Sequence, residues 1–261
     1  MNNYLRSVFA EFKKRKRSLF LLLHVLIPIL FSVVLSSYVF LRKDTQLIND
    51  RSIFVTFFEL LSIGAPLIIV IICGLSAESE KEAGNFQNML VRTETKVITF
   101  LSQLTMLIFC FLFSTFFSII IYVVALKYLI GINIVDLGFY LTMGVVFTIS
   151  CSFQYGLSML ISYRFGMGLN SVIGLAGLII AALSPTMLVD KVWPFLPWSW
   201  PIRIPMYFFW NKVGIQSNGY FAYSEYNTAI TGFCVLIISS ISIVIIDLIW
   251  FQNWYGKSTN E

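Results

Sequence analysis

The stretch Ala77–Phe100, AESEKEAGNFQNMLVRTETKVITF, is an island of charge between two long apolar runs. Its charged side chains are Glu78, Glu80, Lys81, Glu82, Arg92, Glu94 and Lys96. Because charged groups are costly to hold in hydrocarbon, this stretch should lie in water. The apolar runs on either side are each long enough to cross a bilayer, so residues 77–96 are expected to form a loop at one membrane face.

The first part of this loop has the pattern of a short acidic helix. Glu78 and Glu82 are four residues apart, so on a helix they share one face, with Lys81 beside them. Gly84 is predicted to end that helix, and Asn85 can help the chain to turn. Such a helix at a membrane surface is a suitable docking site for a soluble partner. The alternative is a solvated loop that only joins two spans.

Composition favours an integral membrane protein with one domain over residues 1–261. The chain is 58% hydrophobic and only 12% charged, whereas soluble domains carry about twice that charge. The fold class expected is all-α and polytopic. The net charge of +5 is too modest and too clustered to favour nucleic acid, and it agrees instead with basic loops facing anionic lipid.

Six apolar runs predict six membrane spans, at about 19–41, 53–75, 97–126, 137–161, 169–189 and 228–250. Before them, apolar residues recur at helical spacing at positions 5, 8, 9 and 12, and a basic run follows. This pattern predicts an interfacial helix over residues 3–17, on the side of the membrane with anionic lipid. A disordered basic tail is the alternative.

The distribution of basic residues orients this topology. Of the 18 basic residues, eleven fall on the side of the N-terminal helix and the charged loop, and seven on the opposite side. The positive-inside rule therefore predicts that Met1 and Glu261 are both cytoplasmic.

The segment 190–225, between the fifth and sixth predicted spans, is rich in proline and tryptophan. It holds Pro194, Pro197, Pro201, Pro205, Trp193, Trp198, Trp200 and Trp210. Proline interrupts helices and tryptophan prefers the headgroup region, so short re-entrant helices at the outer interface are expected. Trp198 and Trp200 either contact a substrate at the end of a path or only anchor the chain. Glu59, the one acid of the second span, either pairs with a neighbouring span or contacts a cationic peptide.

No catalytic, cofactor or metal site is predicted. The four cysteines lie within apolar runs and have no CxxC spacing, which is typical of apolar packing rather than of a metal site or disulfide. Gly256-Lys257-Ser258 imitates the end of a phosphate-binding loop, but Phe251 stands where that motif needs glycine. The chain is therefore not expected to be an enzyme.

Three segments carry a resemblance to a known family. Glu82-Ala83-Gly84-Asn85-Phe86 followed by Leu90 resembles the loop after the second span in ABC type-2 permeases. The segments Leu22–Pro28 and Pro197–Pro201, LLHVLIP and PWSWP, resemble the small permeases of lantibiotic immunity transporters. The resemblance extends to the whole chain, since the family has an elbow helix, six spans and an outer segment before the last span.

The resemblance implies a transport function powered by another chain. Two copies of a cytoplasmic ATPase, which hold ATP and Mg, would drive this permease and a second, non-identical permease. Contacts with the ATPase would come from Glu78, Glu80, Lys81, Glu82, Gly84 and Phe86. The cargo would be a lantibiotic or similar amphipathic peptide, expelled from a bacterial cytoplasmic membrane past Glu59, Trp198 and Trp200. Alternatives are export of another hydrophobic peptide or drug, and a membrane scaffold or sensor that transports nothing.

Overall fold

All secondary structure in the described part of the chain is helical. The computed structural model describes residues 3–15, 19–42, 50–84, 86, 96–132, 136–213 and 226–254. Five helical stretches within these ranges are long and apolar enough to cross a bilayer: Leu22–Arg42, Arg51–Glu82, Lys96–Ile130, Leu137–Phe165 and Asn227–Gln252. The fold is therefore that of an all-helical polytopic membrane protein.

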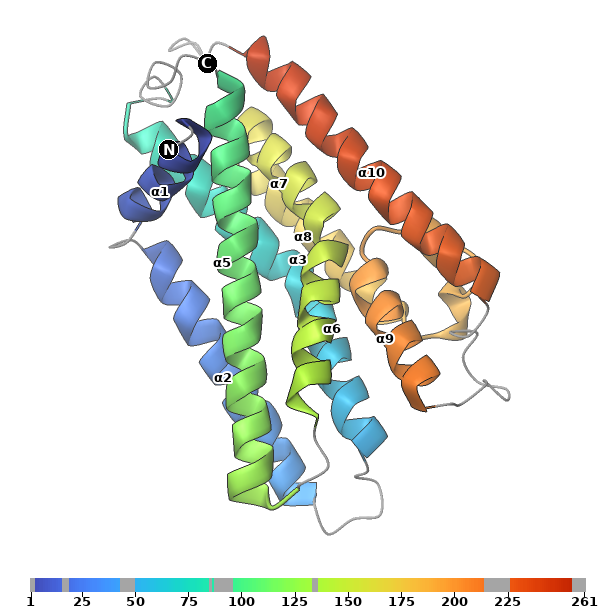
Figure 1. Cartoon of the computed structure of the whole chain (residues 1–261). Coiled ribbons are helices and arrows are strands. Elements are labelled where there is room, and N and C mark those ends of the chain that lie inside the picture. Colours follow the sequence, from blue (N-terminus) through green and yellow to red (C-terminus); the bar gives the residue numbers. More distant parts are fainter. Residues whose placement is uncertain are drawn as a thin grey trace.

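The long helices form one elongated bundle (Figure 1). Its helices are α2 (Leu19–Arg42), α3 (Asp50–Glu82), α5 (Lys96–Val124), the π-helix η1 (Ala125–Ile130), α6 (Leu137–Ser150), α7 (Ser152–Phe165), α8 (Met167–Leu183) and α10 (Tyr226–Gln252). Helix α3 packs mainly on α8 and α7, and α5 packs on α2 and α6. The short helix α1 (Asn3–Arg15) packs on α5 at the end of the bundle where α3 and α10 end, which we call the terminal end.

Aromatic rings and small residues explain this packing. Phe54 on α3 stacks on Phe209 with ring centroids 4.2 Å apart, and Phe57 stacks on Tyr122 of α5 at 4.7 Å. Helix α8 approaches α3 closely because Gly174 has no side chain. A Cβ at Gly174 would come within 2.8 Å of Val70. Small residues allow such close helix contacts in membranes.

Helix α8 is shorter than the predicted fifth span at 169–189. It has 17 residues and ends at Leu183, a length of about 26 Å. Ser184, the residue after the helix, still has helical backbone angles, and Pro185 follows it. Proline has no backbone N–H to donate, so helical hydrogen bonding does not continue through position 185. The chain then continues through short turns of 3₁₀ helix, η2 (Met187–Val189) and η3 (Trp193–Phe195), into α9 (Trp200–Val213).

Helix α9 lies alongside the half of the bundle remote from the terminal end. Near its start, the carbonyl of Pro201 accepts a hydrogen bond from Ser62, close to the middle of α3 (2.9 Å). At its last turn, Lys212 Nζ lies 2.6 Å from Asp136, the residue that caps the start of α6. The segment predicted to hold short helices thus contains them. Its residues 214–225 lie outside the described part.

The start of the charged stretch is helical, as the acidic-helix pattern predicted, but this helix is the continuation of α3 and not a separate short one. Helix α3 continues through the charged residues to Glu82, because alanine, glutamate and lysine favour helix and nothing interrupts them. Gly84 has φ 123°, a value that glycine adopts readily, so the predicted stop is confirmed. Residues 85 and 87–95, which include Arg92 and Glu94, lie outside the described residues.

Candidate functional site

The exposed surface at the end of α3 is the candidate docking site. Glu78, Lys81, Glu82 and Gly84 are all exposed there, as a site for a soluble partner requires. We call these residues the acidic tip. It presents two carboxylates and one ammonium group at the terminal end of the longest helix in the described part of the chain.

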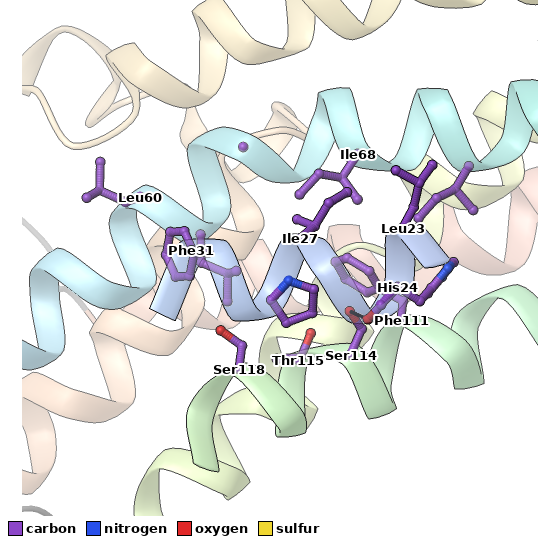
Figure 2. Close-up of a pocket in the computed structure, with 14 residues that line it drawn as sticks. Leu23, His24, Ile27, Phe31, Leu60, Ile68, Phe111, Ser114, Thr115 and Ser118 are labelled. Atoms are coloured by element: carbon purple, nitrogen blue, oxygen red, sulfur yellow. Dashed lines mark hydrogen bonds between the residues drawn. The ribbon is translucent and has the colours of Figure 1, made fainter. Parts of the chain in front are cut away.

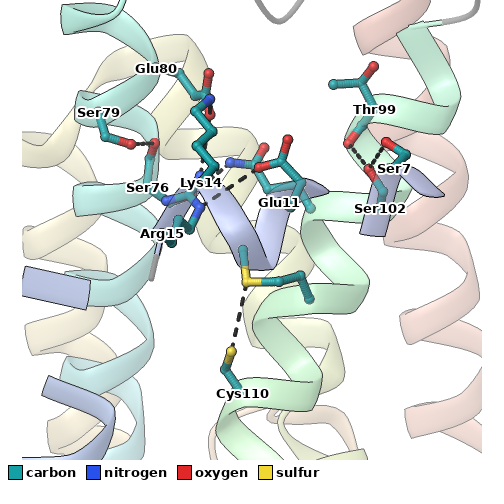
Figure 3. A network of polar contacts seen from close by, with 12 residues as sticks. Ser7, Glu11, Lys14, Arg15, Ser76, Ser79, Glu80, Thr99, Ser102 and Cys110 are labelled. Atoms are coloured by element: carbon teal, nitrogen blue, oxygen red, sulfur yellow. Dashed lines mark hydrogen bonds and ion pairs between the residues drawn. The ribbon is translucent and has the colours of Figure 1, made fainter. Parts of the chain in front are cut away.

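Glu80 points the other way, into the protein, which corrects its prediction as a docking contact. It is only 2% exposed. Its carboxylate pairs with Lys14 and lies 3.4 Å from the guanidinium of Arg15, while Arg15 also faces Glu11 at 3.9 Å (Figure 3). These four charges tie α1 to α3. A carboxylate held in this way is not accessible to another protein.

Phe86 is also buried, although the sequence suggested that it would anchor a partner. It is 3% exposed, and its ring lies 5.0 Å from that of Trp254 and 5.6 Å from that of Tyr163. Its φ of 68° lies in the left-handed region that is strained for a phenylalanine. Its N–H donates to the carbonyl of Glu80, which satisfies a backbone acceptor at the end of α3.

A buried polar layer lies beneath the acidic tip. Tyr163 of α7 donates to Gln103 of α5 at 2.5 Å, and Gln103 donates to Ser76 of α3 at 2.7 Å. Buried polar side chains with partners specify one arrangement of helices. The layer therefore fixes the ends of α3, α5 and α7 to one another.

Helix α1 turns its polar side to the bundle and its apolar side outward. Tyr4 lies 2.5 Å from Thr105, and Ser7 lies 2.8 Å from Ser102, both on α5. In contrast, Leu5 is 48% and Phe9 64% exposed. This arrangement suits a helix that lies at a lipid surface. Residues 16 and 17 of the predicted interfacial helix lie outside the described part.

The predicted path residues differ in burial and in the groups that they contact. Trp200 is fully buried, and its Nε1 donates to the carbonyl of Pro194 at 2.9 Å, so it is a core residue rather than a substrate contact. Trp198 is half-buried against Gly177. Glu59 is half-buried on α3 and experiences the charge of Arg203.

Arg203 is 1% exposed and holds the end of α8. Its Nε donates to the carbonyl of Ser184 at 2.7 Å. Its Nη2 donates to the carbonyl of Thr186 at 2.9 Å and lies 2.6 Å from the carboxylate of Asp190. Sequence reasoning did not single out Arg203, Gln103, Tyr163 or the pairing of Arg15. The only signal for them was their polarity within or beside apolar runs.

The described residues contain no group of three or more histidine, cysteine, aspartate or glutamate side chains placed to hold a metal ion. Comparisons with known proteins found no matching family model, no matching curated protein and no matching solved structure. The function proposed below therefore rests on the residues, their geometry and the resemblance of the sequence segments.

Proposed function

We propose that the chain is the membrane-spanning permease subunit of an ABC transporter, driven by a separate cytoplasmic ATPase. The observation that carries the proposal is the acidic tip. Its exposed carboxylates stand at the end of a 33-residue helix that runs the length of the bundle, a distance of about 50 Å. A force applied at this tip acts directly on a helix that contacts α7, α8 and α9.

The partner surface that matches the tip is basic. Glu78 and Glu82 lie on one helical face, and each exposed ion pair with a partner would contribute on the order of 1 kcal/mol or less. One lost pair should weaken docking only modestly. Reversal of both charges should cost several kcal/mol, because like charges would then face each other.

Motion would pass from the tip to the spans through contacts already described. The pairing of Glu80 with Lys14 and Arg15 makes α1 move with α3. The layer of Ser76, Gln103 and Tyr163 couples α3 to α5 and α7. Closure of two ATPase copies on ATP and Mg would thus rock the helices of this permease and of a second, non-identical permease between two states.

The cargo that the resemblance favours is an amphipathic antimicrobial peptide such as a lantibiotic, expelled outward from a bacterial cytoplasmic membrane. Both termini would be cytoplasmic. Glu59 remains the candidate contact for a cationic peptide, because it is an acid on a spanning helix and retains some exposure. Trp198 is a candidate through its partial exposure only.

The test is to reverse the charges of the tip. Glu78→Lys with Glu82→Lys should leave the protein inserted. The variant should no longer co-purify with the partner ATPase or stimulate its ATP hydrolysis. The matched control is Glu78→Gln with Glu82→Gln, which removes attraction without adding repulsion and should weaken binding only in part. Full binding and stimulation with the double lysine variant would refute the docking role. Binding and stimulation without peptide export would favour the scaffold or sensor alternative.

A further inference from the structure

An apolar slot lies between α2, α3 and α5. It is partly open, and the space within it together with the open space in front of it is about 500 Å³. Its walls are formed from α2 between Leu23 and Phe31 and from α3 between Leu60 and Ile72, with Phe111 and three hydroxyl residues on α5. The slot follows the helices, with Leu60 and Phe31 toward one end and His24 toward the other (Figure 2). Its long axis therefore runs along the spans, as a lipid chain does.

His24 is the one titratable side chain that lines the slot, and it has an unused polar atom. Its Nδ1 lies 2.7 Å from the carbonyl of Phe20, so Nδ1 carries the hydrogen and donates. Nε2 has no partner, although the side chain is only 8% exposed. Two of the three hydroxyls on α5 are already engaged, since Ser114 donates to the carbonyl of His24 and Ser118 lies 2.8 Å from Ser32.

Positive charge lies just beyond the His24 end. The rings of His24 and Phe20 are 4.3 Å apart, and the guanidinium of Arg15 lies 5.4 Å above the ring of Phe20. Arg15 and Lys14 share the carboxylate of Glu80, and Arg15 also faces Glu11, so with exposed Lys13 these five charged groups sum to +1. The slot is thus apolar along its length, polar at one end and basic immediately outside that end.

We propose that this slot holds one acyl chain of an anionic glycerophospholipid, with its phosphate beside the basic end of α1 and a headgroup hydroxyl or ester oxygen at His24. Apolar cavities stay free of water but accept apolar ligands, and basic groups at a membrane surface attract anionic lipid. Contacts between the acyl chain and the apolar walls supply affinity, while Lys13 and His24 select the headgroup. This lipid site is independent of ATPase docking and of the cargo.

Gly64 provides a direct way to fill the slot. It lines the wall on α3, and a Cβ there would meet nothing closer than Ile68 Cδ1 at 4.0 Å. Gly64→Leu can therefore enter the slot without displacing backbone. Gly168 provides the matched control, because it is an exposed glycine of α8 with no neighbour within 4 Å of an added Cβ.

The experiment is native mass spectrometry of the purified chain titrated with phosphatidylglycerol or phosphatidylcholine. Wild type and Gly168→Leu should retain phosphatidylglycerol in preference to phosphatidylcholine. Gly64→Leu should lower that retention about tenfold, because a tenfold loss of affinity corresponds to about two methylene groups of the acyl chain that are no longer buried. Lys13→Glu should remove the preference for phosphatidylglycerol. Equal retention by Gly64→Leu and wild type, or no preference in wild type, would overturn the proposal.

A second measurement needs no variant. Phosphatidylglycerol with a photoreactive group in its acyl chain should label wild-type peptides from the slot walls on α2, α3 and α5. Label confined to the outer faces of α8 and α10 would exclude the site. Displacement of the bound lipid by an antimicrobial peptide, at concentrations that support export, would instead assign the slot to cargo and so would also overturn the proposal.

Discussion

The guanidinium of Arg15 lies 3.4 Å from the carboxylate of Glu80, and this contact joins the first helix of the chain to the end of α3. Both side chains are buried, at 5% and 1% exposure. Lys14 shares the same carboxylate from a partly exposed position. The end of α3 therefore carries the exposed carboxylates of the acidic tip and, between them in sequence, the buried carboxylate of Glu80, which holds α1 against α3.

Glu80→Gln should weaken the attachment of α1 to α3, while the contacts of α1 with α5 remain. Removal of one member of a buried ion pair is strongly destabilising, and because Arg15 keeps Glu11 at 3.9 Å the loss should be at the low end, about 3 kcal/mol of unfolding free energy. The check is thermal unfolding in detergent beside Glu78→Gln, an exposed carboxylate only two residues away. Equal unfolding temperatures for the two variants would contradict the assigned role of Glu80.

Phe86→Ala should destabilise the terminal end rather than remove a docking contact. The ring is buried against Trp254 and Tyr163, and truncation of a buried phenylalanine costs about 3–5 kcal/mol. Phe113→Ala is the control, because Phe113 is 63% exposed. Unfolding and the tryptophan emission spectrum measure the effect. An unchanged spectrum and stability, with ATPase docking lost, would restore Phe86 as a partner anchor.

Trp200→Ala should reduce the amount of folded protein, and any loss of peptide resistance should follow from that reduction. Trp200 is fully buried against Phe153 and donates to Pro194, so its truncation creates a large cavity. Trp198→Ala, at a half-buried position, should leave the folded amount close to wild type. Quantified membrane expression beside resistance separates the two. Well-folded Trp200→Ala protein without resistance would point to a substrate contact instead.

The pair of Asp136 and Lys212 should contribute stability that depends on pH. The hydrogen bond from Lys212 lowers the pKa of Asp136 below its usual value of 3.8, and the N–H of Phe139 acts in the same direction. The folded pKa lies below the unfolded one, so the stabilisation is complete above pH 3.8 and is lost as the pH falls through the folded pKa.

Asp136→Asn keeps a good helix cap but loses the ion pair. Its unfolding temperature should be slightly below that of wild type at pH 7, since exposed pairs contribute little. The difference should vanish in acid. A difference that persists at low pH would show that capping, rather than charge, accounts for the effect.

Topology can be tested by single-cysteine labelling in cells, in a background without the native cysteines. Glu82→Cys, on the exposed tip, should resist a membrane-impermeant reagent, whereas Asn49→Cys, in the predicted loop on the other side, should react. Glu82 suits this test better than Glu80, whose burial would block the reagent regardless of side. Reaction of Glu82→Cys from outside would reverse the proposed orientation.

The sequence predicts a helix correctly where hydropathy or local backbone chemistry alone determines its position or its end. Apolar runs located α2, α3, α5 and α10, and Gly84 marked the end of α3 because a local conformation requires it. The burial of Glu80 and Phe86 was not predictable in the same way. Each depends on a partner far along the chain, Arg15 for one and Trp254 for the other. Amphipathic spacing indicates a face, but it does not say which distant element covers it.

The pairing of Arg15 with Glu80 also sets an order of assembly during synthesis. The two residues are 65 positions apart, with α2 and nearly all of α3 between them. When the first helix leaves the ribosome, the carboxylate that will neutralise it has not yet been made. The charge pairing that holds α1 against α3 can therefore form only after α2 and nearly all of α3 have been synthesised.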